Sequence, residues 1–320
     1  MARKTISDKM LAFSSSTLTG GSASYGGVPV AGNFAYSNPS FVPTSAGSYT
    51  ASIVFNPTDS YNYTTVVGSV SVTVNRLATG SINASTSPNP SILGQTIKVN
   101  FTVPGGNSLT PTGSVTVTDV SGASCTGALT NGSGSCNLSL PEFVNGNPTV
   151  GKRTLTLKYS GDANFTDRTS TFIHNVWYMF TGFYSPLAPV GDTSYSGVFN
   201  LSKSVTLKWT LQDYSGTTLG ILNANILYAI GPLAPNANGS CPLPAQVPVL
   251  LNYNGAYPAP VSVLYSPTQG AKGNSTFRIA SSNNQYIFNW DTSTATSSGC
   301  YVVELDLNSG QALRTSLYLK

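Results

Sequence analysis

The residues best suited to chemistry in this chain are four cysteines, which fall as two widely separated pairs. Cys125 and Cys136 form one pair, and Cys241 and Cys300 form the other. A structural zinc ion needs four ligands, and neither pair has a nearby histidine or third cysteine to complete such a set. We therefore expect two disulfide bonds, the first of which would staple two adjacent strands of a hairpin whose turn lies at residues 128–132.

Two disulfides indicate an oxidising compartment. The N-terminal residues carry a basic patch but lack the apolar segment of a signal peptide. We expect the sequence to be the C-terminal part of a longer exported protein, located at the cell surface or outside the cell.

Acid–base or nucleophilic catalysis would depend on a single histidine, His174. It lies in a strand-like stretch without a Gly-x-Ser-x-Gly nucleophile motif, so a structural or solvent-facing His174 is favoured over a general base. The carboxylates are scattered, and Asp59 and Asp162 are better explained as turn residues that accept local backbone hydrogen bonds. We expect no catalytic residue and no cofactor.

Calcium is a possible ligand, because several extracellular sandwich modules bind it between domains. The ion takes six to eight oxygens, usually from several neighbouring carboxylates. The densest acidic pair on a predicted loop is Asp162 with Asp167, and no Asp-x-Asp-x-Asp run exists. The sequence therefore predicts no metal site.

Exposed aromatic rings could stack on sugars, whose C–H faces suit an apolar platform. Tyr253 and Tyr257 lie in a Pro-rich stretch and are the candidates for ligand binding, while Tyr61 and Tyr63 raise the same question. Other aromatic side chains alternate with polar ones and are predicted to fill a core, namely Trp209, Phe288 and Trp290.

Composition excludes several classes of protein. Only 8% of the 320 residues are charged, against about 25% in an ordinary soluble domain, so long salt-bridged helices and coiled coils are excluded. The net charge is +4, with no basic stripe to bind nucleic acid. No apolar run is long enough to insert into a membrane as a helix. Glycine, proline, tyrosine and alternating Thr/Val favour short strands joined by turns.

A repeat organises the first half of the chain. Residues 46–55 and 150–159 both place a glycine before an alternating strand that ends in an aromatic residue, and Asp59 and Asp162 follow at matching places. The offset of about 100 residues is the size of one Ig-like sandwich domain. The third part of the chain reads as one all-β domain with a long irregular insertion at about residues 221–285. In its strand 303–307 the two acids, Glu304 and Asp306, point away from the apolar face.

Three segments resemble known families. Residues 79–176, with PNPSILGQ at 88–95, PTGSVTV at 111–117 and YSGDANF at 159–165, closely resemble bacterial Ig-like repeat domains. Residues 15–76 look like an MBG-type Ig-like module whose usual opening strand is not evident. Residues 177–320 resemble a PxKF-type domain, although the namesake motif falls on TLKW at 206–209. The expected organisation is a tail at 1–14, modules at 15–76 and 79–176, and a final all-β domain at 177–320.

The expected fold is therefore all-β, with tandem Ig-like β-sandwich modules. The resemblance implies a non-catalytic spacer or adhesion segment of an extracellular or cell-surface bacterial protein, with neighbouring domains of a longer chain as partners. Two alternatives remain open. One is a glycan-binding or adhesin module that binds glycans or other surface proteins, and the other is a set of accessory domains of a secreted hydrolase. Partners among nucleic acids are not expected.

Overall fold

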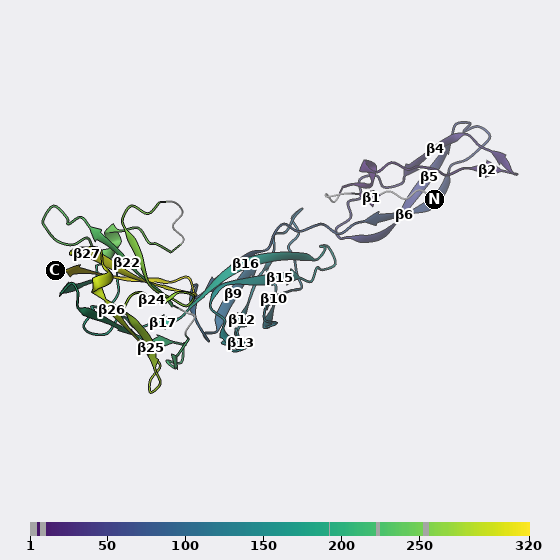
Figure 1. Ribbon diagram of the computed structural model, residues 1–320. Helices are drawn as coiled ribbons and strands as arrows, with labels where there is room; N and C mark the ends of the chain where they lie inside the picture. The colour runs from purple at the N-terminus through teal and green to yellow at the C-terminus, as the bar shows by residue number, and fades with distance from the viewer. Residues whose placement is uncertain (1–4, 7–10, 192, 222–224, 252–255) are drawn as a thin grey trace.

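The computed structural model describes residues 5–6, 11–191, 193–221, 225–251 and 256–320. Within these residues nearly all regular structure is β-strand, with only short 3-10 turns besides. The predicted all-β fold class is confirmed. Figure 1 shows the strands gathered into three regions that follow one another along the molecule. We call residues 5–76 the first region, residues 79–176 the second and residues 177–320 the third.

The first region is built on one sheet with strand order β1-β6-β5-β4, beside a small hairpin β2-β3. Phe13, Ala51 and Val72 form its buried cluster, while Thr50 and Ser52 on either side of Ala51 are exposed, as period-two alternation requires. Only one face of the sheet is therefore apolar. The bounds are β1 Thr5–Ile6, η1 Phe13–Ser15, β2 Ser24–Tyr25, β3 Val28–Pro29, β4 Gly32–Tyr36, β5 Gly47–Pro57 and β6 Val66–Val74.

The second region is a sandwich of two sheets with orders β11-β10-β15-β16-β8 and β12-β9-β7, beside a hairpin β13-β14. Alternating residues of β10 and β15 point into the core, and Val115, Val117, Leu155 and Leu157 are fully buried. The bounds are β7 Asn83–Ser87, β8 Ser91–Ile92, β9 Ile97–Thr102, β10 Ser114–Asp119, β11 Ser124–Ala128, β12 Ser133–Leu138, β13 Phe143–Val144, β14 Asn147–Pro148, β15 Gly151–Tyr159 and β16 Arg168–Trp177.

The first disulfide differs from its prediction in what it joins. The predicted turn is present, with Asn131 and Gly132 at positive φ and an antiparallel bridge between Thr130 and Ser133. Beyond that bridge the two strands no longer pair with each other, because β11 pairs with β10 while β12 pairs with β9. The expectation of a staple within one hairpin was wrong. The bond from Cys125 to Cys136 instead ties the two sheets together at one edge.

Two glycines allow β11 and β12 to lie close together although the two strands belong to different sheets. A Cβ atom on Gly127 would collide with the carbonyl oxygen of Ser135, and one on Gly134 would collide with that of Ala128, while the ring of Phe101 closes both positions from the core side. The backbones of β11 and β12 can therefore approach only where a side chain is absent.

We expect Gly127→Ala or Gly134→Ala to lower the free energy of unfolding by about 1 to 3 kcal/mol, the usual cost of forcing extra volume into a packed site. Denaturant unfolding followed by circular dichroism measures this loss. The matched control is Gly106→Ala, because a Cβ at Gly106 would meet nothing within 4 Å. Equal stabilities for all three variants would contradict the close-approach explanation.

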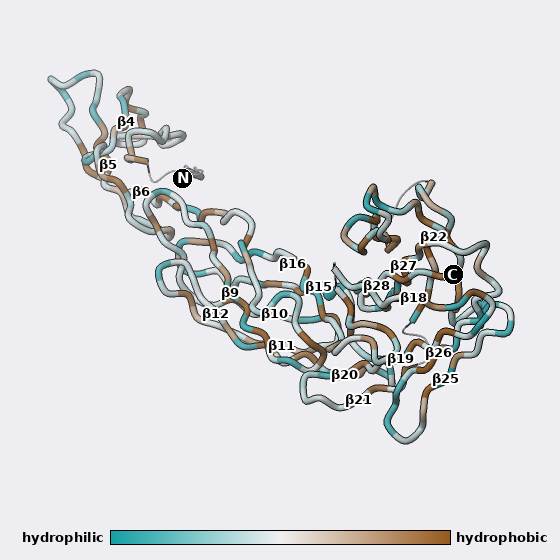
Figure 2. The backbone as a smooth tube through the Cα atoms, turned by 90° about the vertical axis from the view of Figure 1, so that its left-hand side faces the viewer, coloured by the Kyte–Doolittle hydropathy of each residue, from teal (hydrophilic) through white to brown (hydrophobic). Residues whose placement is uncertain are grey.

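The third region packs a six-stranded sheet, β18-β28-β27-β22-β23-β24, against the three-stranded sheet β19-β26-β25, with β17-β20-β21 at the side. In Figure 2 apolar stretches recur along these strands. The predicted core residues Trp209, Phe288 and Trp290 are fully buried, and the Trp209 and Tyr286 rings stack with their centroids 5.3 Å apart. Burial of such rings contributes most to a core of this kind.

Several strands of the third region lie where the sequence predicted an irregular insertion. β22, β23, β24 and β25 all fall within residues 221–285, so the predicted range was too wide. Their alternation is broken by Pro232 and by turns, which hides the period. Between β22 and β23, the described residues 234–251 and 256–260 hold no strand, and we call them the strap. The bounds are β17 Met179–Phe180, β18 Tyr195–Phe199, β19 Ser204–Trp209, β20 Leu211–Gln212, β21 Thr218–Leu219, β22 Asn225–Leu233, η3 Pro244–Gln246, β23 Val261–Ser266, β24 Gly270–Ala271, β25 Thr276–Ala280, β26 Gln285–Asp291, η4 Thr292–Thr294, β27 Gly299–Leu307 and β28 Ala312–Leu319.

All three regions pair an early strand with their last strand, and always in parallel. β1 pairs with β6, β8 with β16, and β18 with β28. Because the two strands of each pair run in the same direction, the first residue of the early strand and the last residue of the last strand lie at opposite ends of the pair. A pull on the two ends of the chain would load these hydrogen bonds along the strands.

Candidate functional site

Both predicted disulfides are present. Cys241 bonds to Cys300, so the strap is tied covalently to β27. Among the described residues no cysteine is free. The described residues also contain no group of three or more His, Cys, Asp or Glu side chains that could hold a metal ion.

The two tyrosines predicted to bind a ligand are placed unequally. Tyr253 lies outside the described residues. Tyr257 is half-buried and packs against a small apolar cluster of Ile230, Val247 and Val302. Its hydroxyl donates a hydrogen bond to the Pro248 carbonyl. Because the ring packs on the strap and the sheet beneath it and the hydroxyl is bonded within the strap, a sugar site at Tyr257 would use only the remaining exposed part of the ring.

His174 is fully buried on β16 between two hydroxyl groups. Its Nε2 lies 2.8 Å from the Ser91 Oγ, and its Nδ1 lies 3.0 Å from the Thr86 Oγ1. Burial lowers the pKa of the imidazole, although the charge of Asp119 opposes this. Ser91 and His174 resemble a nucleophile–base pair in spacing, but both are sealed from solvent, at 1% and 0% exposure. Their arrangement serves to satisfy buried polar atoms.

Asp162 caps a loop, as the sequence predicted. Its Oδ1 accepts the N–H groups of Asn164 and Phe165, each at 2.8 Å, and its Oδ2 accepts the N–H and hydroxyl of Thr112. Partial burial opposes ionisation, but these donors hold the pKa of Asp162 below its usual value. With its oxygens engaged in this way, the carboxylate stabilises the loop.

A buried acidic pair lies beneath the strap. Glu304 is fully buried and Asp306 is 5% exposed, and both point away from the apolar core, as predicted from the alternation of β27. The Glu304 Oε1 accepts the N–H groups of Leu250 and Leu251 at 2.8 and 3.1 Å. On the neighbouring strand, Arg314 donates to the Val247 carbonyl at 2.7 Å. These bonds clamp the strap onto the outer face of the six-stranded sheet.

Two buried carboxylate oxygens of this pair have no hydrogen-bond partner among the described residues, namely the Glu304 Oε2 and the Asp306 Oδ1. Burial, and then the negative charge of Glu304, raise the pKa of Asp306 to about 8. A proton retained on Asp306 can be donated to Glu304 and removes the repulsion between two buried carboxylates. Sequence alternation placed both acids on the outer face but held no sign that the strap would bury them.

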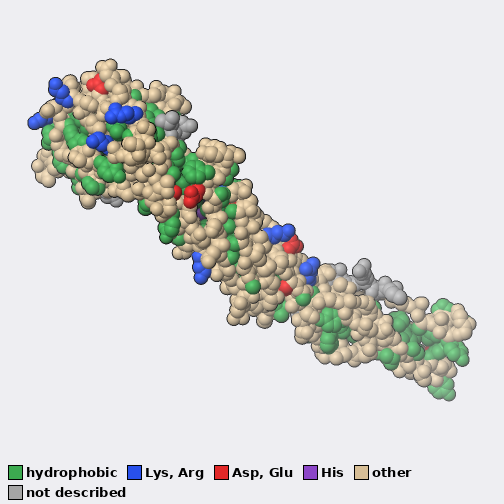
Figure 3. Space-filling view, turned by 90° about the horizontal axis from the view of Figure 1, so that it is seen from below, with side chains coloured by type: hydrophobic (Ala, Val, Ile, Leu, Met, Phe, Trp, Pro, Cys, Tyr) green, Lys and Arg blue, Asp and Glu red, His purple; other side chains and the backbone are tan. Residues whose placement is uncertain are grey.

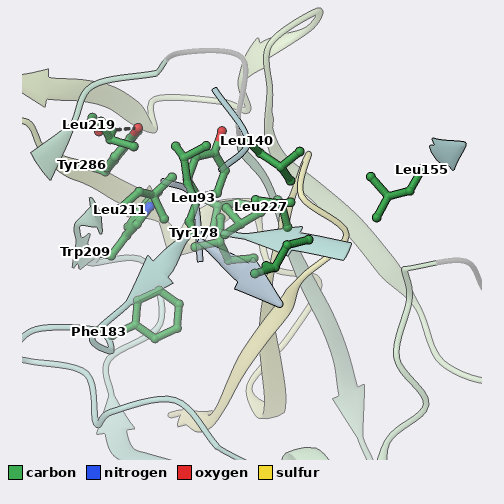
Figure 4. Close-up of a cluster of buried hydrophobic side chains, with 14 of the residues drawn as sticks. Leu93, Leu140, Leu155, Tyr178, Phe183, Trp209, Leu211, Leu219, Leu227 and Tyr286 are labelled. Atoms are coloured by element: carbon green, nitrogen blue, oxygen red, sulfur yellow. Dashed lines mark hydrogen bonds between the residues drawn. The ribbon is translucent and has the colours of Figure 1, made fainter. Parts of the chain in front are cut away.

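The second and third regions meet through a continuous apolar core. Leu93 is fully buried there; its N–H donates to the Trp177 carbonyl and its carbonyl accepts from the Tyr214 N–H, both at 2.8 Å. The Gln311 side chain bonds both backbone groups of Tyr178, at 2.9 and 3.1 Å. Figure 4 shows Leu93, Leu140 and Tyr178 gathered beside Trp209 and Leu211 of the third region. The segment around Trp177 and Tyr178, which links the second and third regions, is thus packed and hydrogen-bonded. These contacts limit bending between the two regions.

The first and second regions meet through a shorter contact. Leu77 forms a parallel bridge with Phe165, with its N–H donating to the Asn164 carbonyl and its carbonyl accepting from the Thr166 N–H, both at 2.8 Å. The Ala46 N–H adds a bond of 2.9 Å to the Asn164 Oδ1. The loop of residues 160–167 therefore grips the segment that leaves β6.

Taken together, these contacts define the chain as a multidomain β-protein. Its β-sheet regions follow one another in series, and the junctions between them are held by packing and hydrogen bonds. No helix among the described residues is long and apolar enough to cross a membrane.

Within this class, residues 84–176 match the bacterial Ig-like domain family (group 3). This match lies inside the segment for which the sequence resembled bacterial Ig-like repeats. Domains of that kind are typically non-catalytic structural modules of multidomain proteins. The family match covers the second region and leaves the other two unassigned.

No curated protein matches the chain. Several solved structures are similar at low scores. Fibronectin(III)-like modules of Clostridium thermocellum CbhA show 11% identity over 74% of this chain and 92% of theirs, with a TM-score of 0.23. A marsupial T cell receptor shows 11% identity over 75% and 73%, at 0.27. A β-glucuronidase of Parabacteroides merdae shows 10% over 75% and 25%, at 0.22. Scores this low say nothing about function.

Proposed function

We propose that this chain is a non-catalytic structural segment of a bacterial extracellular or cell-surface protein, which holds neighbouring domains apart under load. The observation that carries the proposal is the parallel pairing of an early and the last strand in each region. Bonds loaded along the strand direction must break together, whereas bonds loaded across it break one after another.

Two further observations support this role. The second and third regions share a continuous apolar core around Leu93 and Tyr178. Because no flexible segment separates them there, force is transmitted directly from one region to the other. The two disulfides suit an oxidising compartment outside the cytosol, where bacterial Ig-like domains commonly occur.

Single-molecule pulling on the full chain tests the proposal. With attachment at residues 1 and 320 the β18–β28 pair is loaded along the strands, so we expect a high rupture force for the third region. With attachment at Ser202 and Lys320, which follow the neighbouring ends of β18 and β28, the same pair is peeled apart and the force should be lower. Equal forces in the two geometries would overturn the load-bearing role.

A glycan array with the full chain tests the competing adhesin hypothesis. A pure spacer should bind nothing above background. Reproducible binding of one glycan class, lost on Tyr257→Ala, would replace the structural proposal with the adhesin function.

A further inference from the structure

One edge of strand β6 in the first region presents unused backbone groups. The Ser52 carbonyl accepts the N–H of Ser37, just after β4, so Ser52 and alternate residues of β5 bond toward β4, while the residues between them bond toward β6. The register pairs one of these, Ala51, with Val70, so Val70 and its alternate neighbours bond to β5. The residues of β6 between them therefore turn their N–H and C=O groups away from β5.

These outward residues are Val67, Ser69 and Ser71. Within the described part of the chain their N–H and C=O groups have no hydrogen-bond partner, since β1 pairs with Thr73 and Val74, beyond this stretch. All three residues are exposed, and a hollow of about 990 Å³ beside Ser69 and Ser71 leaves room for another chain. An open row of this kind can accept one further strand.

The corresponding strand of the second region is protected at the same edge. On β16 the outward N–H of Asn175 donates to the Asn89 Oδ1 at 3.1 Å, and the strand begins with the charged Arg168. Charged side chains, prolines and bulges are the usual protection of sheet edges. Between Val66 and Val72, β6 contains no charged residue and no proline, and its pairing with β5 has no bulge.

The sequence of β6 is complementary to itself when two copies run antiparallel. From Val66 to Val72 it reads VVGSVSV, so pairing centred on Ser69 sets Val66 opposite Val72 and Val67 opposite Ser71. The outward residues then meet as hydrogen-bonded pairs, which exchange both of their backbone bonds. On the apolar face, valine meets valine at either end of the contact. A dimer with a twofold axis needs a surface patch of this self-complementary kind.

Charge does not oppose such a contact. Asp59 is the one charged residue in the sequence from 11 to 75. In Figure 3 the narrow end of the molecule shows apolar and uncharged surface. Val66 and Val67 are 60% and 72% exposed, so an added strand would cover apolar surface that the isolated chain leaves in water. These features favour a second copy of the uncharged strand over a charged partner.

We propose that β6 is a self-association strand, which pairs antiparallel with β6 of a second copy of this chain about a twofold axis at Ser69. The sheets of the two first regions become one continuous sheet across this axis. Pairing ends at Val66 and Val72, just before Thr73, where β1 already occupies the edge. The inference goes beyond the load-bearing role, because it gives the chain a partner and links two copies side by side.

Analytical ultracentrifugation of the full chain tests the proposal, and we expect a reversible monomer–dimer equilibrium. Ser69→Pro removes an N–H that β5 does not use, so the strand can still form, and the dissociation constant of the dimer should rise at least about tenfold. Ser69→Ala keeps the N–H and should dimerise as the parent chain does. A parent chain that stays monomeric overturns the proposal and leaves the edge to a segment of the same chain or to another protein. A dimer unchanged by Ser69→Pro overturns it as well.

Cysteine cross-linking locates the contact without the proline variant. Ser69→Cys places two thiols opposite each other across the axis, within reach of a disulfide, so mild oxidation should give a covalent dimer on a nonreducing gel. The matched control is Ser52→Cys, because Ser52 is an exposed serine paired with Ser69 on the neighbouring strand. The two Ser52 positions of a dimer lie about 14 Å apart, at three strand spacings, so this variant should not cross-link.

Equal cross-linking of the Ser69→Cys and Ser52→Cys variants would contradict the proposed pairing. None of these results affects the pulling experiment on β18 and β28, so failure here is distinct from failure of the load-bearing role.

Discussion

Replacing Cys241 and Cys300 together by serine should lower the free energy of unfolding of the third region by about 4 kcal/mol. The bridge closes a loop with a sequence separation of 59, and the entropy it removes from the unfolded chain grows with loop length. Cys125 and Cys136 are separated by only 11 residues, so serine at both positions should cost about 2 to 3 kcal/mol. Denaturant titration measures both losses.

The two losses can be read in separate regions. Trp209 and Trp290 are buried in the third region, so tryptophan fluorescence reports mainly on its unfolding. Circular dichroism reports on all the sheets. A larger loss for the 125/136 variant than for the 241/300 variant would contradict the loop-length explanation and would point to the tie between the two sheets as the more important contribution.

The stability of the third region should fall as pH rises from about 4 to about 8. Burial and the charge of Glu304 raise the pKa of Asp306 to about 8 in the folded chain, from about 3.9 in an unfolded one. Between these values the folded state holds a proton that the unfolded state has released, so stability declines by up to about 1.4 kcal/mol per pH unit. Denaturant midpoints followed by fluorescence over this range measure the slope.

The groups that face Asp306 define the controls. Glu304 lies on the same strand, Tyr228 on β22 and Arg314 on β28; burial raises the pKa of Tyr228, and the two acids raise it further. Asp306→Asn keeps a donor without titrating and should flatten the slope. A stability that rises between pH 4 and 8 in the parent chain would show that Asp306 does not retain its proton.

Acids with lowered pKa values act in the opposite direction at lower pH. Asp119 is one of them: burial raises its pKa, but hydrogen bonds from Arg153 and Ser121 outweigh that effect. Its contribution to stability is lost only as the pH falls through its lowered value. Within pH 4 to 8 the buried His174, whose pKa is lowered, acts in the opposite direction, because the unfolded state binds a proton there that the folded state does not. It lies in the second region, so a decline in the stability of the third region over this range is assigned to the acidic pair beneath the strap.

Alternation along each strand was enough to predict the cores. Leu155 and Leu157, and likewise Trp209 and Trp290, are buried because period-two patterning places them on one face. The pairing of β11 and β12 could not be predicted, since Asn131 and Gly132 specify only the local turn. Beyond the turn the two strands join different sheets but stay close together, and this close approach requires the missing side chains of Gly127 and Gly134.

The buried polar groups were the least predictable. His174 could be interpreted as structural or solvent-facing, because the hydroxyls that satisfy it, on Thr86 and Ser91, lie more than 80 residues away in sequence. Glu304 and Asp306 are covered by a strap whose residues follow no period.

The Cys241–Cys300 bond also limits how far the protein can lengthen. Residues between the two cysteines are bypassed by the crosslink, so a fully drawn-out chain is shorter by roughly 200 Å, given the sequence separation of 59 and about 3.6 Å per extended residue. Reduction of the disulfide would make this additional length of chain available for extension in a single step. The bond therefore limits the distance over which the third region can be extended.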